Sequence, residues 1–339
     1  MNLATLNTIL ETIPTLRVTL IGDGCVDIYW HADMRLSELS REVPQHPLPI
    51  VREQFSLGAG ANVLANLAAL GAKDIRYVGC IGNDWRGAIF RRLLEEIHVS
   101  DRYLVTSDSI ITSAYCKPIR HGISPVAYED PRLDFTNLEP ICEEVEQQVL
   151  DSLLQAVEDT DILIVCDQFA NSCISPRILA TINELGKKMP VIVDSRNRIG
   201  LYKNVIVKPN EVEACACLQL PADTVLQPEG PRCVAQKMEA LTGRPALVTL
   251  GEHGAIWCEN GACTHVPALP VQPPIDFVGA GDAFLAGFSL AHTQHAAPET
   301  ALRFANLVSA ITIKKLGITG TASPAEMRDA FAHYGLSEE

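Results

Sequence analysis

The stretch DFVGAGDAF, residues 276–284, places three small residues directly before a carboxylate at the expected start of an apolar helix. Small residues such as Gly279, Ala280 and Gly281 let the backbone turn tightly and leave N–H groups free, and the helix dipole adds positive potential at that end. Asp282 could cap this helix or take a proton from a substrate hydroxyl. The stretch therefore predicts an anion site with a candidate base beside it, built without a lysine or an arginine.

Two further stretches carry oxygen donors or glycines in patterns that suit a phosphate ligand. In KPNEVEA, Asn210 and Glu213 lie three residues apart and so share one side of a helix's first turn. Hard oxygen donors there suit water-mediated contacts to Mg²⁺ and phosphate, but the same spacing also fits a capping box. In TLGEHGA, Thr249, Gly251 and Gly254 either let a nucleotide approach the backbone or form a simple turn into a following hairpin.

A glycine-flanked helix start over 57–72, LGAGANVLANLAALGA, holds Asn62, whose amide could hydrogen-bond a polyol. Several well-known site patterns are absent from the sequence. It has no GxxxxGK[ST] loop, no GxGxxG after a strand, no GxSxG elbow and no HExxH pair. These absences exclude a Walker-type P-loop and remove the usual support for dehydrogenase and hydrolase interpretations.

Short β-rich apolar runs alternate with helical segments along most of the chain. Continuous apolar runs are typical of parallel strands buried on both faces, so the sequence predicts a doubly wound α/β fold with a mostly parallel sheet and helices on both faces. The expected strands span 17–23, 75–82, 161–167, 190–195, 204–210 and 246–251. The expected helices span 61–70, 86–97 and 175–188, the last with Ser175 as its N-cap and Pro176 at its first position.

Several of these strands end in a polar residue or a glycine. Because the carboxyl ends of strands in an open α/β sheet border the ligand crevice, we expect these residues to gather along one edge. Asp and Asn at such positions also cap following helices, and that alternative stays open. The residues concerned are Asp23, Asp167, Asp194, Asn210 and Gly251.

Two segments, 28–57 and 110–135, interrupt the alternation with prolines, alternating apolar positions and no helical period. They predict extended strands outside the main sheet, in a small β lid or dimer clasp; the alternative is surface loops. A small extended lid leaves strand edges that a second copy of the chain could cover, so a homodimer is expected.

The composition predicts one large α/β domain over residues 1–339, with the lid as its appendage. The chain carries 27 basic and 41 acidic side chains, a formal net charge of −14, and 47% hydrophobic residues. This acidic balance argues against nucleic acid and anionic membranes as partners, although a helix N-terminus can still hold a small anion. The 11 cysteines have no CxxC spacing, so buried thiols are expected rather than a zinc site.

The amino-terminal stretch, MNLATLNTILETIPTL, has neither the basic region nor the cleavage signature of a secretory signal. No run of about 18 apolar residues occurs in the chain, so no membrane span is expected. The sequence therefore predicts a cytoplasmic protein, in which thiols stay reduced.

Taken together, these features resemble the ribokinase/PfkB family of carbohydrate kinases over roughly residues 15–325. The family signature Asp-Thr-x-Gly-Ala-Gly-Asp-x-Phe corresponds to residues 276–284, and the other motifs follow in the family order. They are Gly-x-x-x-x-Asp at 22–27, Gly-Ala-Gly-Ala-Asn at 58–62, Asn-x-x-Glu at 210–213 and Thr-Leu-Gly-x-x-Gly at 249–254.

Within the family, the chain looks most similar to the kinase that phosphorylates heptose 7-phosphate at O1. The similar stretches are DIYW after the opening motif, the arm SREVPQHPLPIV, PRLDF at 131–135 and FANLVSAITIKKLGITGTAS toward the carboxyl end. Where that branch has Asp-Tyr-x-Lys-Gly after its central strand, residues 167–171 are Asp-Gln-Phe-Ala-Asn.

The resemblance implies an ATP-dependent kinase that transfers the γ-phosphoryl group to a sugar hydroxyl. It implies that Asp282 is the base that activates this hydroxyl and that the amides of Gly279 to Gly281 form the anion hole for the transferring phosphate. The sugar itself is assigned to Asp27, Gly58, Gly60 and Asn62.

The same resemblance implies ATP and Mg²⁺ as cofactors. Asn210 and Glu213 belong to the Mg²⁺–phosphate network, with Mg²⁺ held by Glu213 through water. Asp276, with the backbone of 312–317, resembles a site for a monovalent cation such as K⁺. The adenine nucleotide is expected along Thr249, Gly251, Gly254 and Asn306.

Other functions stay open at this stage. One is a different kinase of the same fold, acting on a nucleoside or a hexose phosphate; another is a non-catalytic sugar- or nucleotide-binding regulatory protein. Lys117, Arg120 and Arg132 on the predicted lid bear on the substrate. Pointing inward they would favour a phosphorylated sugar, and facing solvent they would favour a neutral one.

Overall fold

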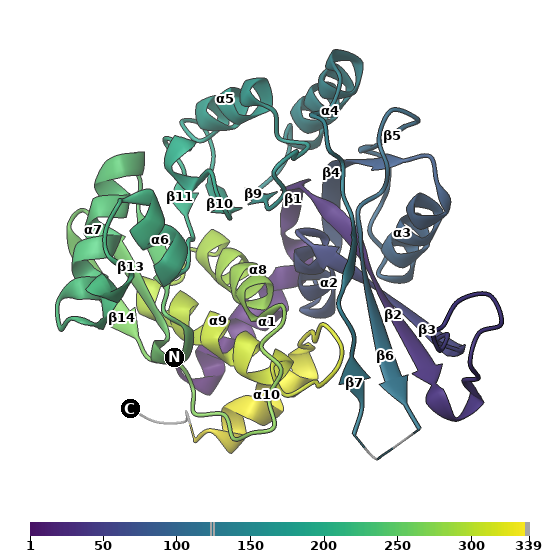
Figure 1. The fold of residues 1–339 in the computed structure, drawn as a ribbon. Coiled ribbons are helices and arrows are strands. Elements are labelled where there is room, and N and C mark those ends of the chain that lie inside the picture. The colour runs from purple at the N-terminus through teal and green to yellow at the C-terminus, as the bar shows by residue number, and fades with distance from the viewer. Residues whose placement is uncertain (123, 125, 336–339) are drawn as a thin grey trace.

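Nine strands form the main sheet of the computed structural model, which describes residues 1–122, 124 and 126–335 (Figure 1). Their spatial order is β14-β13-β12-β11-β10-β9-β1-β4-β5, and neighbours from β12 to β5 run parallel. The hairpin β13–β14 adds an antiparallel edge. The strands are β1 (Arg17–Gly22), β4 (Asp74–Gly82), β5 (Leu104–Ser107), β9 (Ile162–Asp167), β10 (Val191–Ser195), β11 (Ile206–Val207), β12 (Ala246–Thr249), β13 (Ala255–Glu259) and β14 (Ala262–Val266).

Helices cover both faces of this sheet, as the sequence predicts. One hydrophobic core is shared by α1 (Leu3–Thr12), α2 (Ala61–Ala69), α3 (Trp85–Glu96), α8 (Ala280–Thr293), α9 (Pro298–Thr312) and α10 (Pro324–His333). The core on the other face is shared by α4 (Glu143–Ala156), α5 (Pro176–Leu185), α6 (Glu211–Cys217) and α7 (Gly230–Thr242). The predicted doubly wound α/β architecture, with a mostly parallel sheet between two layers of helices, is confirmed.

The central strand β9 shows why the strands have unbroken apolar sequences. Ile162, Ile164 and Cys166 belong to one core, whereas Leu163 and Val165 belong to the other. Because successive side chains of a strand point to opposite faces, a strand covered on both sides needs an apolar residue at every position.

The strand order reverses between β1 and β9. From β1 the chain continues outward through β4 to β5, and from β9 it continues in the opposite direction through β10, β11 and β12. The crevice outside the carboxyl ends at such a reversal is where open α/β sheets hold their ligands. In this chain it lies beyond Gly22 and Asp167.

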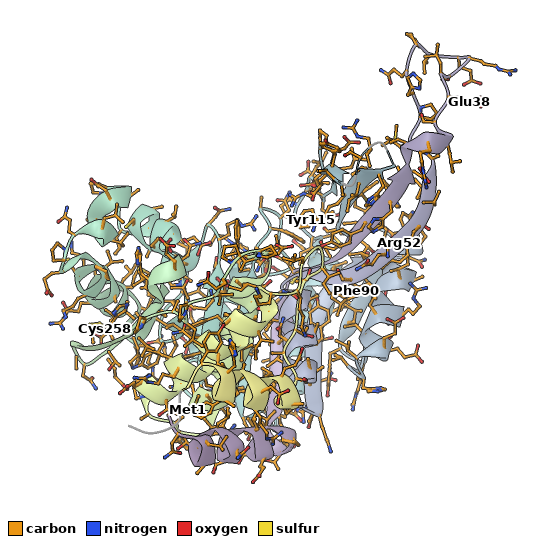
Figure 2. The ribbon with its side chains drawn as sticks, turned by 90° about the horizontal axis from the view of Figure 1, so that it is seen from below. Met1, Glu38, Arg52, Phe90, Tyr115 and Cys258 are labelled. Carbon is orange, nitrogen blue, oxygen red and sulfur yellow. A yellow bond between two sulfur atoms is a disulfide. The ribbon has the colours of Figure 1, made fainter. Side chains whose placement is uncertain are left out.

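A second sheet extends away from the main body as an arm, with Glu38 near its tip (Figure 2). Its order is β3-β2-β6-β7, and β8 also pairs with β6. The strands are β2 (Gly24–Asp33), β3 (Ile50–Ala59), β6 (Ala114–His121), β7 (Tyr128–Glu129) and β8 (Leu133–Phe135). We call this sheet the lid. Both segments predicted as extended strands contribute to it, although β2 begins earlier than expected, at Gly24.

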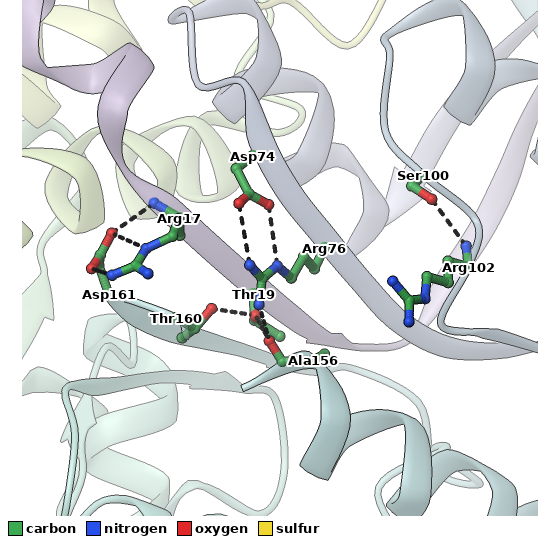
Figure 3. A network of polar contacts seen from close by, with 9 residues as sticks. All are labelled: Arg17, Thr19, Asp74, Arg76, Ser100, Arg102, Ala156, Thr160 and Asp161. Carbon is green, nitrogen blue, oxygen red and sulfur yellow. Dashed lines mark hydrogen bonds and ion pairs between the residues drawn. The ribbon is translucent and has the colours of Figure 1, made fainter. Parts of the chain in front are cut away.

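A polar network ties the amino-terminal ends of the strands together, opposite the crevice (Figure 3). Asp161, just before β9, accepts the backbone N–H of Arg17 at 2.8 Å and pairs with its guanidinium at 2.7 Å. Arg76 of β4 and Thr19 of β1 both donate to the carbonyl of Ala156, at 2.8 and 3.0 Å. These contacts fix the register of β1, β4 and β9 at their amino-terminal ends. The carboxyl ends of the three strands are therefore aligned as well.

Two expectations differ from the structure. The strand predicted over 204–210 is only Ile206–Val207, because Pro209 has no N–H to continue the ladder. The expectation that the thiols are reduced is wrong for Cys258 and Cys263. These cysteines face each other across the β13–β14 hairpin, with Cα atoms 4.1 Å apart, and are joined by a disulfide.

The start of α5 provides a stability test. Ser175 Oγ accepts the N–H of Ile178 at 3.2 Å, and Pro176 follows, as predicted. Ser175→Ala should lower the free energy of unfolding by about 1 kcal/mol in urea titrations, because it leaves that N–H without its acceptor. Ser175→Asp keeps an acceptor and should retain wild-type stability. Equal losses in the two variants would contradict the capping role.

Candidate active site

Asp282 lies in the first turn of α8 and is partly buried. Asn62 of α2 donates its amide to Asp282 Oδ2 at 2.8 Å, and Gln168, just after β9, approaches Oδ1 at 3.5 Å. Burial raises the pKa of Asp282 to about 6, although both amide donors act to lower it. The carboxylate is therefore ionised at neutral pH and more basic than an exposed aspartate.

Backbone N–H groups gather beside this carboxylate. Gly279 caps α8 in the left-handed conformation, with φ of 78°, and a Cβ there would meet Asn62 Nδ2 at 2.7 Å. Among the described residues, no acceptor pairs with the N–H groups of Gly279, Gly281 and Asp282. The structure differs from the prediction for Ala280, whose N–H donates to the carbonyl of Phe277 at 3.1 Å. The N–H groups of Gly279, Gly281 and Asp282 are therefore the ones at this helix start that remain available to a ligand.

A lysine, which sequence reasoning missed, also faces the start of α8. Lys208 Nζ lies 3.9 Å from where a Cβ on Gly281 would stand, so the expectation of an anion site without a lysine or arginine is wrong. Its side chain is buried and pairs with Asp194 at 3.1 Å. Burial acts to lower the pKa of Lys208, but the carboxylates of Asp194, Glu213 and Asp282 raise it overall. The sequence signal for this lysine is its position in KPNEVEA, close to Asn210. The parallel sheet then brings Lys208 close to α8.

Asn210 and Glu213 form the capping box that the sequence left as an alternative. Asn210 Oδ1 accepts the N–H of Glu213 at 2.8 Å, and Glu213 Oε2 accepts the N–H of Asn210 at 2.9 Å. Burial raises the pKa of Glu213, and the nearby Asp194 carboxylate adds to the shift. A cation would relieve this repulsion, so the donor set fits a Mg²⁺ ion. Within the described ranges no group of three or more His, Cys, Asp or Glu side chains could hold a metal ion.

The residues assigned to the sugar lie together at the base of the lid. Asp27 of β2 is buried and pairs with Lys117 of β6 at 2.9 Å, and this ammonium also donates to Tyr29 at 3.1 Å. Gly58 of β3 has no room for a Cβ because the Asp27 carboxylate packs against it. Gly60 precedes α2, where Cys166 of β9 packs closely. Asn62, predicted for the sugar, is turned toward Asp282.

All three lid cations named by the sequence have carboxylate partners. Lys117 points inward to Asp27. Arg120 is partly exposed and pairs with Asp130. Arg132 pairs with Asp134 at 2.6 Å, and its guanidinium lies over the Tyr115 ring, 3.9 Å from the ring centre. The charge of each of these three cations is therefore already balanced by a carboxylate.

The residues predicted for the nucleotide lie close together around the end of β12 and the entry to the β13–β14 hairpin. The N–H of Thr249 donates to the carbonyl of Pro209 at 3.1 Å, so the end of β12 lies beside the KPN stretch. Gly251 begins a short 3₁₀ turn, and Gly254 packs against Val266 at the entry to the hairpin, which is the simple-turn alternative. Asn306 lies beside Gly254, because its buried amide donates to the carbonyl of Pro267 at 2.9 Å and Gly254 packs against the same Val266–Pro267 segment.

Asp276 joins two backbone segments near the anion hole. Its carboxylate oxygens accept the N–H groups of Val278 and Gly317, each at 3.1 Å. Its own N–H donates to the carbonyl of Ile313 at 2.8 Å. Asp276 and the backbone of 312–317, which are predicted to bind a monovalent cation, therefore lie next to each other.

Two of the strand-end aspartates are structural. Asp23 accepts backbone N–H groups from Gln168, Phe169 and Cys173 at 2.8 to 3.0 Å, and the Ser172 hydroxyl at 2.8 Å. Asp167 accepts the hydroxyls of Ser195 and Tyr202 at 2.8 and 3.0 Å and pairs with Arg198. They order the loops that follow β9 and β10, while Asp194 supports Lys208.

The fold and this site define a sugar-kinase class of protein. Residues 26–325 match the pfkB family of carbohydrate kinases, and the chain belongs to that family. Among the described residues, no helix is both long enough and apolar enough to span a lipid bilayer.

Two curated relatives match almost the whole length of this chain. The bifunctional protein HldE of Bradyrhizobium diazoefficiens is 30% identical over 327 residues, which cover 94% of this chain and 63% of that protein. HldE of Rhodopseudomonas palustris strain BisB5 is 30% identical over 347 residues, covering 98% and 67%. The chain thus spans about two thirds of the length of these relatives.

Solved structures share the fold. Phosphofructokinase-2 from Escherichia coli in complex with potassium superposes with a TM-score of 0.73 at 20% identity, covering 94% of this chain and 99% of that one. Arabidopsis thaliana ribokinase complexed with ribose and ATP superposes with a TM-score of 0.67 at 18% identity, covering 93% and 98%.

The Lys208–Asp194 pair makes a stability prediction. Lys208→Met should lower the free energy of unfolding by about 3 kcal/mol, because it leaves Asp194 unpaired in a buried site. Urea titration of the variant measures this loss. The double variant Lys208→Met/Asp194→Asn should recover part of it. A single variant as stable as the wild type would contradict the pairing.

Proposed function

We propose that this chain transfers the γ-phosphoryl group of ATP to a sugar hydroxyl, with Asp282 as the general base. One juxtaposition carries the proposal. The partly buried carboxylate of Asp282 lies beside the unpaired amides of Gly279 and Gly281, and Lys208 faces the same turn. A base and an anion hole at one helix start are the two parts that phosphoryl transfer requires.

The base acts before or as the new bond forms. With its pKa raised to about 6, Asp282 is charged at pH 7 and still accepts a proton readily from a hydroxyl. Its sugar substrate would lie between the carboxylate and the lid, within reach of Asp27. A non-catalytic sugar-binding protein would have no use for such a base.

The phosphoryl group would meet the positive end of α8. The amides of Gly279 and Gly281 and the Lys208 ammonium supply donors for the equatorial oxygens, where negative charge spreads in the transition state. Bound Mg²⁺ neutralises phosphate charge in such reactions, and Asn210 with Glu213 would hold its hydration shell. The end of β12 at Thr249 and Gly251 would receive the adenine nucleotide.

A heptose phosphate is the substrate that the family resemblance and the HldE relatives favour. A neutral sugar is the second candidate, because Lys117, Arg120 and Arg132 each already have a carboxylate partner. A phosphate arriving at the lid would have to displace one of these partners. A nucleoside or a hexose phosphate remains a further acceptor to test.

The proposal also includes a cation and a location. K⁺ would bind at Asp276 and the backbone of 312–317, where it would steady the turn that precedes the anion hole. Since ATP is the proposed phosphoryl donor, the cytoplasm is the proposed site of action.

A coupled ADP-release assay with ATP and Mg²⁺, run over free and phosphorylated sugars, tests this function. Asp282→Asn should fold normally and lose at least about 10²-fold in kcat, because the amide cannot accept the proton. Asp223→Asn, an exposed carboxylate on another part of the chain, serves as the matched control and should keep full activity. Unchanged turnover in Asp282→Asn would remove this residue from the mechanism.

We further propose that two copies of the chain associate through their lids. The strand β3 forms one edge of the lid sheet, and exposed apolar side chains gather on the lid. A hollow of about 540 Å³ is lined by Trp30, Ile50, Val51, Arg52 and Glu53. Unpaired strand edges with exposed apolar side chains favour association with a second copy.

The dimer has its own test. Val51→Asp should shift the mass measured by light scattering from two chains to one, because a charge would be buried at the lid edge. Leu138→Asp is the control, since Leu138 is 85% exposed and lies outside the lid strands. A wild-type monomer at micromolar concentration would contradict the proposal.

A further inference from the structure

The two oxygens of the Asp282 carboxylate are held unequally. Oδ2 accepts the amide of Asn62 at 2.8 Å, whereas Oδ1 is approached by the amide of Gln168 at 3.5 Å. A short hydrogen bond withdraws more charge from its acceptor than a long one. Oδ1 therefore keeps more of the negative charge and is the better proton acceptor of the two.

The Asn62 side of this arrangement is oriented from behind. Asn66, one turn along α2 and fully buried, donates its amide to the carbonyl of Asn62 at 3.0 Å and approaches Asn62 Oδ1 at 3.4 Å. With its oxygen turned toward a donor, Asn62 presents Nδ2 to Asp282. Oδ2 is thus committed to this contact.

The Gln168 side is anchored through the backbone. The buried carboxylate of Asp23 accepts the N–H of Gln168 at 2.9 Å and that of Phe169 at 2.8 Å. The residue before Gln168 is Asp167, whose side chain is held by Ser195 and Tyr202. These contacts restrain the backbone on both sides of Gln168. They therefore hold its side-chain amide beside Oδ1 of Asp282.

We propose that Gln168 is a positioning residue that keeps Oδ1 of Asp282 turned toward the substrate hydroxyl. The inference rests on the proposed function. Gln168 Nε2 carries two hydrogens, so one donates to Oδ1 while the other stays available to the substrate oxygen. As the proton arrives at Oδ1, the contact with Gln168 weakens and the Asn62 contact holds the acid in place.

Substitution of Gln168 tests the proposal through the pH dependence of kcat/KM. In the wild type, activity should fall below about pH 6 as Asp282 becomes protonated, since the base works only when ionised. Gln168→Leu removes a donor to the charged form, so this acidic limb should move upward by roughly half a pH unit. Gln168→Glu adds a neighbouring negative charge and should move it further. The KM for ATP should stay within about twofold, while kcat falls about tenfold.

Asn171→Ala is the matched control from the same loop. The Asn171 amide donates to the carbonyl of Asn137 at 2.9 Å, and it makes no hydrogen bond to Asp282. The acidic limb of the pH profile of Asn171→Ala should coincide with that of the wild type. If Gln168→Leu loses turnover and thermal stability but keeps the wild-type limb, the residue is only structural and the proposal is overturned.

A readout without turnover separates this proposal from the proposed function. Carbon-13 NMR follows the carboxyl of Asp282 through its titration, with the resonance assigned by its loss in Asp282→Asn. A higher midpoint in Gln168→Leu than in the wild type supports the positioning role even if no sugar in the panel is phosphorylated. Equal midpoints overturn it, whatever the kinase assay shows.

Discussion

The carboxylate of Asp282 stays charged at neutral pH although it is partly buried, and the contacts around it make this possible. Burial alone would favour the neutral acid, which could not accept a proton. Two amides donate to the carboxylate, and Lys208 adds a buried positive charge nearby. The balance leaves a pKa of about 6, which allows ionisation at neutral pH without loss of basicity.

Each supporting group comes from a different part of the chain, and the sheet brings them together. Asn62 lies in the first turn of α2, Gln168 follows β9 and Lys208 follows β11. The reversal of strand order between β1 and β9 opens the crevice into which these groups project. The polar network at the opposite ends of the strands keeps this edge aligned (Figure 3).

The lid contributes a second balance of charge. Lys117 and Asp27 neutralise each other in a buried pair, and the Lys117 ammonium also donates to the Tyr29 hydroxyl. Such a pair is costly to desolvate and strongly directional, so it orders the base of the lid rather than adding much net stability. The base of the lid therefore has polar groups of defined orientation and little excess positive charge.

The sequence by itself determined the alternation of strands and helices, the extended lid segments, the N-cap at Ser175 and the small-residue turn before Asp282, because each depends on local periodicity or local backbone freedom. Only the tertiary structure decided that Lys208 faces Gly281, that the Ala280 amide closes a turn, that the Asn306 amide holds Pro267 and that Cys258 meets Cys263. These outcomes depend on strand order, register and the depth of each side chain, which arise from contacts between residues far apart in the chain. A motif therefore predicts which residues can do chemistry, while packing decides which atoms remain free to do it.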